Sequence, residues 1–396
     1  MTPEQGELEQ LRFQRAADVY KAGQLAGRLE RTPAGSVRFE YLPGYVGDPV
    51  ASTLPVRPDP VEVAGGGLPT FFAGLLPEGH RLTVIRQATK TSPDDELTLL
   101  LAVGEDTPGD VQIAPAGAAL VDRSPLIEGD PAHLDFQSLA SAPDRHALPG
   151  VQAKASAAMI NVPLRTATTQ AILKIDPPDH PHLVVNEFAH LQAARSLKIP
   201  VAQAQLVHDS VGVPGLWVTR FDRQAGPESE TRLAVEDGAQ VMDLLPAAKY
   251  TVDSEDLVLA LSGQTNAPLV SVRNLYLQFL FAWLSGNGDL HAKNVSVLQG
   301  ADGRWAVAPV YDIPCTVLYR DFSMALPIQG RTTNLRRRHW DDFAAAIGLP
   351  TKAARSAQTL ALTVAQSIDL AALPFEGSPL NGAERELRFR RGELGS

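Results

Sequence analysis

The chain has 396 residues, of which 44% are hydrophobic and 20% are charged, and its formal net charge is −10. This composition excludes a disordered chain and predicts a globular protein long enough for two or more domains. The net negative charge disfavours general binding to a nucleic-acid backbone, although a local basic face remains open.

Neither a targeting segment nor a disulfide framework is indicated. The N-terminal residues lack the basic and apolar pattern of a signal peptide, and no apolar run reaches the length of a membrane span. We therefore expect a cytoplasmic protein without a membrane partner. The single cysteine, Cys315, excludes internal disulfides and a cysteine-based zinc site, and we expect its side chain to be buried.

Residues 1–120 mix strand and helix patterns and are predicted to form an α+β subdomain. The regular segments are expected at 18–39 (strand, turn, strand), 71–85 (a helix interrupted at Pro77-Glu78-Gly79) and 96–103 (an apolar helix).

Residues 121–223 are richer in strand patterns and are predicted to form a β-rich, nucleotide-binding lobe. Strands are expected at 157–162, 171–175, 201–207 and 216–219, with 220–223 closing the sheet. Alternation along the second strand turns Lys174 away from its apolar neighbours, and a helix is predicted to begin at Asn186-Glu187. Protein kinases use such a strand lysine, paired with a helix glutamate, to hold the α- and β-phosphates of ATP. A solvated lysine on an edge strand is the alternative for Lys174.

Residues 224–396 are predicted to form a helical, catalytic lobe. Helices are expected at 254–261, 275–284, 340–347, 352–368 and 382–391. A β-rich half followed by a helical half indicates a two-lobed α+β fold, with the nucleotide chemistry at the junction of the lobes.

The most informative stretch lies in the helical lobe. The almost unbroken apolar run at 275–284 is too short to cross a bilayer and predicts a helix that is buried on all sides. Glycines at 286 and 288 end this helix, and the patterns at 295–310 predict two short strands joined by a turn.

Three polar side chains follow the buried helix at a spacing typical of kinases. Asp289 and Asn294 are five positions apart, as are the proton-accepting aspartate and the magnesium-binding asparagine of kinase catalytic loops. Asp312 follows the predicted hairpin, where kinases carry the aspartate that bridges metal and phosphates, although Ile313-Pro314 replaces the usual Phe-Gly. Such oxygen ligands suit Mg²⁺, which keeps waters and shares the nucleotide phosphates.

Seven short motifs occur in a fixed order along the chain. They are PGVQAK at 149–154, ILK at 172–174, NE at 186–187, RFDR at 220–223, EDGAQ at 236–240 with LP at 245–246 and KY at 249–250, NGDLHAKN at 287–294 and APVYD at 308–312. This order resembles the HipA-type toxin kinases. The LLPE peptide at 75–78 and RRHW at 337–340 extend the resemblance over nearly the whole chain.

The resemblance implies a serine/threonine kinase of a type II toxin–antitoxin module, with ATP and Mg²⁺ as cofactors. Some family members phosphorylate aminoacyl-tRNA synthetases, which stalls translation and growth. Members are usually held by a small helix-turn-helix antitoxin that also binds operator DNA. The implied partners are therefore a protein substrate and an antitoxin, with DNA contacted only through the antitoxin.

Carried over residue by residue, the resemblance assigns the general base to Asp289 and the magnesium ligands to Asn294 and Asp312. Lys174 would bind phosphate, with Glu187 orienting its side chain.

The remaining nucleotide contacts are implied for two backbone segments and one histidine. They are Gly150, Val151, Gln152, Ala153 and Lys154 over the phosphates, Val218, Thr219 and Arg220 beside the adenine, and His291 in the catalytic loop. For His291, a metal ligand and a hydrogen-bonding loop residue are the alternatives.

One position departs from the family pattern. The phosphate loop of the family commonly carries, three residues before its glycine, a serine that the kinase phosphorylates on itself to stop its own activity. Here that residue is Ala147, which has no hydroxyl to accept a phosphate. We therefore predict no self-inactivation at this site, with Ser156 as a weaker substitute.

Further basic residues have two interpretations each. Lys293, four positions after Asp289, is predicted to steady the transferring phosphoryl group, and a solvated lysine is the alternative. The basic runs at 336–339 and 388–391 form either solvated helix faces or contacts to DNA.

Two rival functions remain open. The peptide GDLH at 288–291 resembles the first motif of metal-dependent phosphoesterases, but no Gly-Asn-His motif follows it. A catalytically silent kinase fold, serving as partner or co-repressor of a DNA-binding antitoxin, is the non-enzymatic alternative. The intact set of Lys174, Asp289, Asn294 and Asp312 argues against a silent fold.

Overall fold

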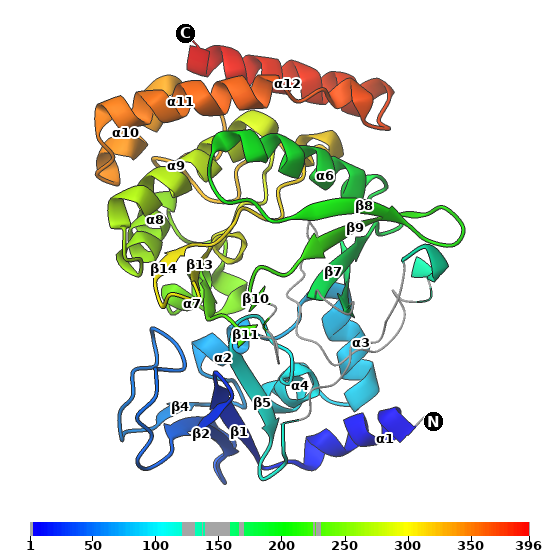
Figure 1. Ribbon diagram of the computed structural model, residues 1–396, viewed down its shortest axis with the longest axis vertical. Coiled ribbons are helices and arrows are strands. Elements are labelled where there is room, and N and C mark those ends of the chain that lie inside the picture. Colours follow the sequence, from blue (N-terminus) through cyan, green and yellow to red (C-terminus); the bar gives the residue numbers. More distant parts are fainter. Residues whose placement is uncertain are drawn as a thin grey trace.

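The computed structural model describes residues 3–120, 131–136, 138, 159–165, 170–224, 226 and 231–395. Figure 1 shows the N-terminal sheet at one end of the molecule, a second sheet in the middle and the C-terminal helices at the other end. The predicted succession of a β-rich half and a helical half is therefore confirmed, whereas the boundaries at 120 and 223 stay a prediction.

The N-terminal region is a five-stranded antiparallel sheet with helices packed against it. The strands lie in the order β4 (Val61–Val63), β3 (Val37–Tyr41), β2 (Gln24–Arg31), β1 (Ala16–Lys21) and β5 (Val111–Pro115). The helices are α1 (Pro3–Gln10), α2 (Thr70–Gly74), α3 (Gly79–Thr89) and α4 (Glu96–Val103).

The sequence prediction for this region was partly right. Residues 18–39 contain three strands rather than two, because the chain reverses twice, at Ala22-Gly23 and near Gly35, and all three residues adopt positive φ. The break between α2 and α3 and the buried helix α4 are confirmed, and α4 packs in the core of this region.

The second sheet is antiparallel, in the order β6 (Ile160–Arg165), β7 (Gln170–Ile175), β9 (Pro214–Thr219) and β8 (Ala204–His208). Helix α6 (Leu183–Ala194) begins three residues earlier than predicted. The carboxylate of Asp176 explains this early start, since it accepts hydrogen bonds of 2.8 Å from the backbone N–H groups of His182 and Val184.

The segment at 220–223 does not close this sheet, contrary to the prediction. The chain leaves β9, and β10 (Arg223–Gln224) pairs with β11 (Thr231–Arg232) in a separate two-stranded ribbon. The arginines of this segment instead form buried ion pairs with the N-terminal region, as described below.

The C-terminal half is helical around a small three-stranded sheet. The sheet consists of β12 (Val235–Asp237), β13 (Ser296–Gln299) and β14 (Trp305–Val307). The helices are α7 (Gly238–Val241), α8 (Ser254–Gly263), α9 (Pro268–Ser285), α10 (Arg337–Ala346), α11 (Thr351–Gln366) and α12 (Gly377–Gly395). No helix of the described ranges is both long and apolar enough to span a bilayer.

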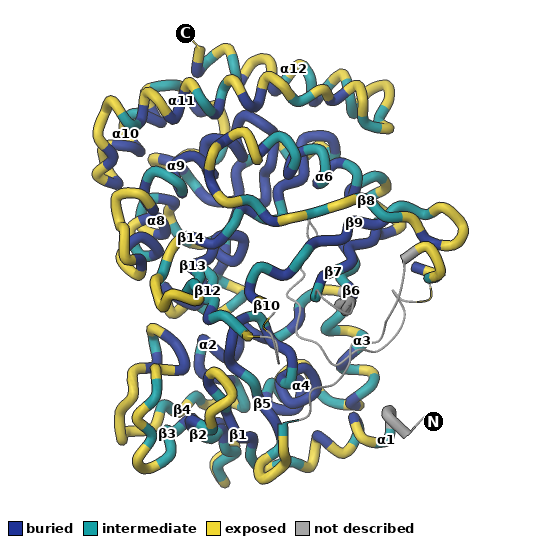
Figure 2. The backbone as a smooth tube through the Cα atoms, in the orientation of Figure 1, coloured by how far each residue is buried: buried dark blue, intermediate teal, exposed yellow. Residues whose placement is uncertain are grey.

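Helix α9 is the centre of this half. Every residue from Leu275 to Ser285 is buried, so the predicted all-round burial is confirmed. Figure 2 shows exposed residues along the outer faces of α10, α11 and α12, whereas the buried residues of this half lie further inside. Because one hydrophobic core joins α9 to α6 and β9, the end of α9 is held rigidly against the second sheet.

Candidate active site

The loop after α9 is fixed by glycines and by one asparagine. Gly286 ends the helix with φ +85°, and a Cβ atom there would lie 2.8 Å from the sulfur of Cys315. At Gly288 a Cβ atom would lie 2.4 Å from the carbonyl oxygen of Ser323. Asn287 donates a 3.0 Å hydrogen bond to the carbonyl of Pro314. The loop that follows α9 is thereby held against the segment that follows Asp312.

Asp289 and Asn294 are joined within this loop. The side-chain amide of Asn294 donates a 2.9 Å hydrogen bond to the backbone carbonyl of Asp289. The Asp289 residue is only 1% exposed, and its carboxylate accepts a 3.0 Å hydrogen bond from the Tyr250 hydroxyl. Burial, together with the nearby Asp289 carboxylate, raises the pKa of Tyr250 well above its usual range. The tyrosine therefore keeps its proton and acts as the donor.

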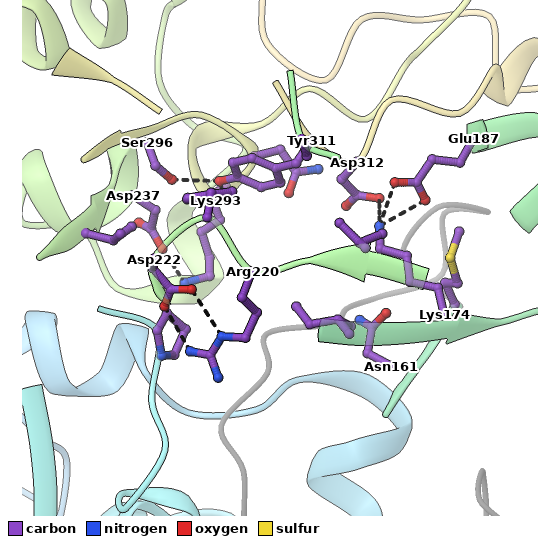
Figure 3. Close-up of a pocket in the computed structure, with 18 of the residues that line it drawn as sticks. Asn161, Lys174, Glu187, Arg220, Asp222, Asp237, Lys293, Ser296, Tyr311 and Asp312 are labelled. Atoms are coloured by element: carbon purple, nitrogen blue, oxygen red, sulfur yellow. Dashed lines mark hydrogen bonds and ion pairs between the residues drawn. The ribbon is translucent and has the colours of Figure 1, made fainter. Parts of the chain in front are cut away.

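Lys174 forms the centre of a buried charged cluster. Its ammonium lies 2.8 and 2.9 Å from the two carboxylate oxygens of Glu187 and 3.2 Å from a carboxylate oxygen of Asp312. Figure 3 shows Glu187 and Asp312 pointing toward Lys174 from different elements. The solvated-lysine alternative is therefore wrong, and the predicted ion pair between strand and helix is present.

The charges of this cluster depend on one another. Burial alone would lower the pKa of Lys174, but the carboxylates of Asp312 and Glu187 outweigh it and raise the pKa above its usual range. Burial raises the pKa of Glu187, an effect that Lys174 opposes. Asp312 has φ +55°, a strained value for a residue with a side chain and one that is common at functional sites.

Lys293 is buried and paired rather than solvated. Its ammonium donates to the carboxylate of Asp237 at 2.7 Å and to the backbone carbonyl of Gly74 at 2.9 Å. Burial alone would lower the pKa of Lys293, but Asp237 outweighs it and raises the pKa. The predicted contact with a phosphoryl group stays a prediction, because both observed partners belong to the protein.

His291 has a structural environment in the loop. Its Nδ1 atom accepts a 3.2 Å hydrogen bond from the backbone N–H of Lys293, and its ring contacts the Tyr250 ring edge-on with the centroids 4.9 Å apart. This geometry favours the hydrogen-bonding interpretation of His291. Within the described ranges, no group of three or more His, Cys, Asp or Glu residues is placed to hold a metal ion.

Arg220 lies at the end of β9, where the adenine contact was predicted. Its guanidinium forms buried ion pairs of 2.8 Å with Asp106 and Asp222, and Arg223 pairs with the same two carboxylates at 2.7 Å. Burial alone would raise the pKa of Asp222, but the two arginines outweigh it and lower the pKa to about 2. The side chain of Arg220 therefore joins the second sheet to the N-terminal region.

One pocket collects the predicted site residues that the structure describes. Its lining includes Lys174, Glu187, Val218, Thr219, Arg220, Asp289, His291, Lys293, Asn294 and Asp312. The predicted phosphate-loop residues Gly150, Val151, Gln152, Ala153 and Lys154, together with Ala147 and Ser156, lie outside the described residues.

Sequence reasoning missed three residues of this region, Asp237, Tyr250 and Tyr311. The Tyr311 hydroxyl donates a 2.8 Å hydrogen bond to the Lys293 carbonyl, and Asp237 binds the ammonium of the same lysine. Asp237, Tyr250 and Tyr311 all stood within the resemblance motifs, which were the one available signal, but the motifs gave them no role.

Part of one basic run was reassigned by the structure, whereas the run at 336–339 stays open between its two interpretations. Arg390 is 1% exposed, stacks on the Trp283 ring at 3.8 Å and donates to the Trp283 carbonyl, while Arg391 donates to the Leu284 carbonyl. Both arginines thus bind the C-terminal end of α9, where a positive charge is favourable. The interpretation of Arg390 and Arg391 as a DNA-contacting or solvated face is wrong.

The predicted burial of Cys315 is confirmed. Its thiol is fully buried, and burial raises the thiol pKa to about 11. Asn186 of α6 exchanges two hydrogen bonds, of 3.0 and 2.9 Å, with the backbone of Cys315. This pairing positions the helix of Glu187 against the segment of Asp312.

A strand lysine paired with a helix glutamate, above a loop that carries an aspartate and an asparagine, defines a kinase-type fold. Family comparison agrees with this class: the HipA-like C-terminal domain matches residues 146–368 and the HipA N-terminal domain matches residues 17–114. The chain belongs to the HipA family.

Two relatives and one solved structure support this assignment. A protein named putative kinase Y4mE, from Sinorhizobium fredii, is 28% identical to this chain. The alignment covers 85% of this chain and 87% of the relative. The serine/threonine-protein kinase toxin HipA of Shewanella oneidensis is 26% identical over 71% of each chain. A chain of the solved complex of HipA, HipB and operator DNA from Shewanella oneidensis has a TM-score of 0.76 at 20% identity, and the match covers 96% of this chain and 98% of that one. The predicted two-lobed α+β fold is thereby confirmed.

Proposed function

We propose that the protein is an ATP- and Mg²⁺-dependent serine/threonine protein kinase. The observation that carries the proposal is the convergence of Lys174, Glu187 and Asp312 within 3.2 Å, in the pocket that Asp289 and Asn294 also line. Kinases need this set of groups, because phosphoryl transfer depends on positioning and on neutralising phosphate charge.

Each group has one task in the proposed reaction. Asp289 accepts the proton of a serine or threonine hydroxyl while the hydroxyl oxygen forms a bond to the γ-phosphorus. The bond from the γ-phosphorus to the bridging oxygen breaks, and ADP leaves with that electron pair. Lys174 donates hydrogen bonds to the α- and β-phosphates, and Glu187 holds its ammonium in place. Backbone groups at Val218–Arg220 would contact the adenine.

The described residues fit a magnesium ion shared with a nucleotide. Asn294 uses its amide nitrogen on the Asp289 carbonyl, which directs the amide oxygen away from that contact, and the Asp312 side chain remains 22% exposed. Two oxygen ligands are what Mg²⁺ takes from a protein when phosphates and waters complete its shell. The bound ion would neutralise charge on the phosphates.

We further propose that the kinase is the toxin of a toxin–antitoxin module in the cytoplasm. Family membership supports this role, as does the relative from Shewanella oneidensis, which is named a serine/threonine-protein kinase toxin. The substrate class would be a component of translation such as an aminoacyl-tRNA synthetase. A small helix-turn-helix antitoxin would be the partner, with DNA reached only through it.

The rival functions have weaker support. A two-metal phosphoesterase needs several further His and Asp ligands around Asp289, and the described part of the chain contains no such cluster. A silent fold would have no chemical need for the buried Lys174–Glu187 pair beside Asp312, whose strained backbone costs stability.

The test is transfer of label from ATP to proteins of a cell extract. Asp289→Ala and Asp312→Ala should each lower the rate at least about a hundredfold, as expected on losing a general base or an electrostatic stabiliser. The matched control is Asp341→Ala, which removes a partly exposed carboxylate that pairs with Arg355 on the outer helices. Transfer that survives both active-site changes, or that needs no Mg²⁺, would contradict the proposal.

Expression in growing cells tests the toxin role separately. The wild-type chain should arrest growth, and Asp289→Ala should not. Growth arrest by both forms would argue against phosphorylation as its cause.

A further inference from the structure

The N-terminal region supplies a carboxylate to the surroundings of the catalytic loop. Glu78 stands in the Pro77-Glu78-Gly79 break, where α2 has ended and α3 begins, and Gly79 adopts φ +59°. This turn directs Glu78 to Lys249, whose ammonium lies 2.6 Å from a carboxylate oxygen of Glu78. The Lys249 side chain is only 2% exposed. Removal of Glu78 would leave a buried cation without its partner, which is strongly unfavourable.

The Lys249 ammonium in turn contacts Tyr250. It lies 5.4 Å from the centre of the Tyr250 ring, and the His291 ring contacts the same tyrosine edge-on. A cation within about 6 Å of an aromatic face is attracted to it, so both neighbours restrict the tyrosine ring. Glu78 therefore acts on Tyr250 through one intervening side chain.

Tyr250 then contacts the proposed base directly. Its hydroxyl donates a 3.0 Å hydrogen bond to one carboxylate oxygen of Asp289, which restricts rotation of that carboxylate. The backbone supports the same connection, because the carbonyl of Lys249 accepts a 3.2 Å hydrogen bond from the N–H of Ala292. The catalytic loop is thus attached to the Lys249-Tyr250 dipeptide through a side chain and through the main chain.

We propose that Tyr250 is a positioning residue for Asp289, and that Glu78 of the N-terminal region completes the catalytic centre by fixing Lys249 against Tyr250. The inference rests on the proposed kinase function and extends it. The N-terminal region is thereby a functional part of the catalytic centre, although Glu78 itself touches neither nucleotide nor acceptor hydroxyl.

The size of the effect follows from the geometry. A general base contributes to the rate only while its oxygen is held within reach of the hydroxyl, and small displacements are costly. Tyr250→Phe removes one oxygen and keeps the ring against His291. The maximal rate of the Tyr250→Phe variant should fall about tenfold. This fold-change corresponds to the lower end of the free energy that is lost with a hydrogen bond to a charged group. The ATP concentration for half-maximal rate should change by less than about twofold, because the nucleotide is held elsewhere.

The kinetic experiment compares four full-length variants with the wild type. They are Tyr250→Phe, Glu78→Gln, Lys249→Met and the control Tyr276→Phe, which removes a buried hydroxyl bonded to Trp340 and Gln358 inside the helical core. Label transfer from ATP to extract proteins should fall in the first three and stay at the wild-type level in the control. A fifth variant, Lys249→Arg, keeps the positive charge and should retain more of the rate than Lys249→Met.

A double substitution distinguishes a connected series of contacts from general loss of stability. If Glu78 acts through Tyr250, then Glu78→Gln should lower the rate much less in the Tyr250→Phe background than in the wild type. Equal losses in both backgrounds would overturn the connection between the two residues.

Amide hydrogen exchange tests the same connection without using activity. The peptide at 287–295 should exchange faster in Tyr250→Phe and Glu78→Gln than in the wild type and in Tyr276→Phe. If the wild type transfers no label, the proposed function fails, and exchange still decides on the positioning role. If the wild type is active and Tyr250→Phe matches Tyr276→Phe in both rate and exchange, the positioning role is wrong.

Discussion

Substitutions in the Lys174–Glu187 ion pair should affect the stability of the protein and its kinase activity in different ways. The lysine ammonium lies 2.8 and 2.9 Å from the two oxygens of Glu187, with side chains only 10% and 1% exposed. Loss of one partner from a buried pair costs about 3–5 kcal/mol, because the remaining charge stays buried. In Glu187→Gln, Asp312 remains 3.2 Å from the ammonium as a second partner. We therefore expect the lower end, a loss of about 3 kcal/mol in the free energy of unfolding.

Replacement of both charges should give a different outcome. The variant Lys174→Met with Glu187→Leu fills the same space with apolar groups, and such replacement of a buried pair is often neutral or stabilising. Asp312 loses its ion-pair partner in this double variant, but its side chain is 22% exposed and can be hydrated. The variant should therefore unfold at a urea concentration close to that of the wild type, yet bind ATP weakly and transfer no label. Urea unfolding and titration calorimetry with ATP measure the two properties. A double variant that keeps kinase activity, or a Glu187→Gln variant as stable as the wild type, would refute the reasoning.

Two further predictions concern the core around the loop. Burial lowers the pKa of His190 to about 4 from its ordinary value of 6.5, so the unfolded chain takes up a proton first as the pH falls. The free energy of unfolding should therefore drop by about 3 kcal/mol between pH 6.5 and 4 from this residue, at 1.36 kcal/mol per pH unit, and His190→Gln should lose that part of the pH dependence. A pH profile of urea unfolding that is the same in His190→Gln and the wild type would contradict the lowered pKa of His190. Gly286→Ala places a Cβ atom 2.8 Å from the Cys315 sulfur at φ +85°, and it should lower the free energy of unfolding by about 1–3 kcal/mol. The control Gly382→Ala has open space around its Cβ position, and equal stability of Gly286→Ala and Gly382→Ala would show that the loop tolerates the strain.

Local patterns were sufficient for the elements that carry the proposed chemistry. The apolar run of α9 and the short strands after it depend on residues close in sequence, and the structure confirms them. The start of α6 was placed three residues late, because its signal is the side chain of Asp176, seven positions before the helix. The third strand at 18–39 was missed although Gly23 and Gly35, two glycines typical of turns, stand at the two reversals of the chain.

The contacts between distant segments were beyond local reasoning. For Lys293 the solvated alternative is wrong, because its ammonium binds Asp237 and a carbonyl 219 positions earlier in the chain, two partners that the sequence did not indicate. The arginines Arg390 and Arg391 showed the same difficulty, since their partners lie 107 positions away at the end of α9. A charged residue gives no indication in the sequence of which buried carbonyl or carboxylate it will meet.

The sequence by itself determined the helical and strand periodicities, the loop that carries Asp289 and Asn294, and the order of motifs that places the chain in its family. These depend on backbone sterics and on side-chain spacing over a few residues. Only the tertiary structure decided that Glu78 faces Lys249 and that Tyr250 faces Asp289. The physical reason is that a buried polar group must find a partner wherever packing brings one, and packing joins segments without regard to their separation along the chain.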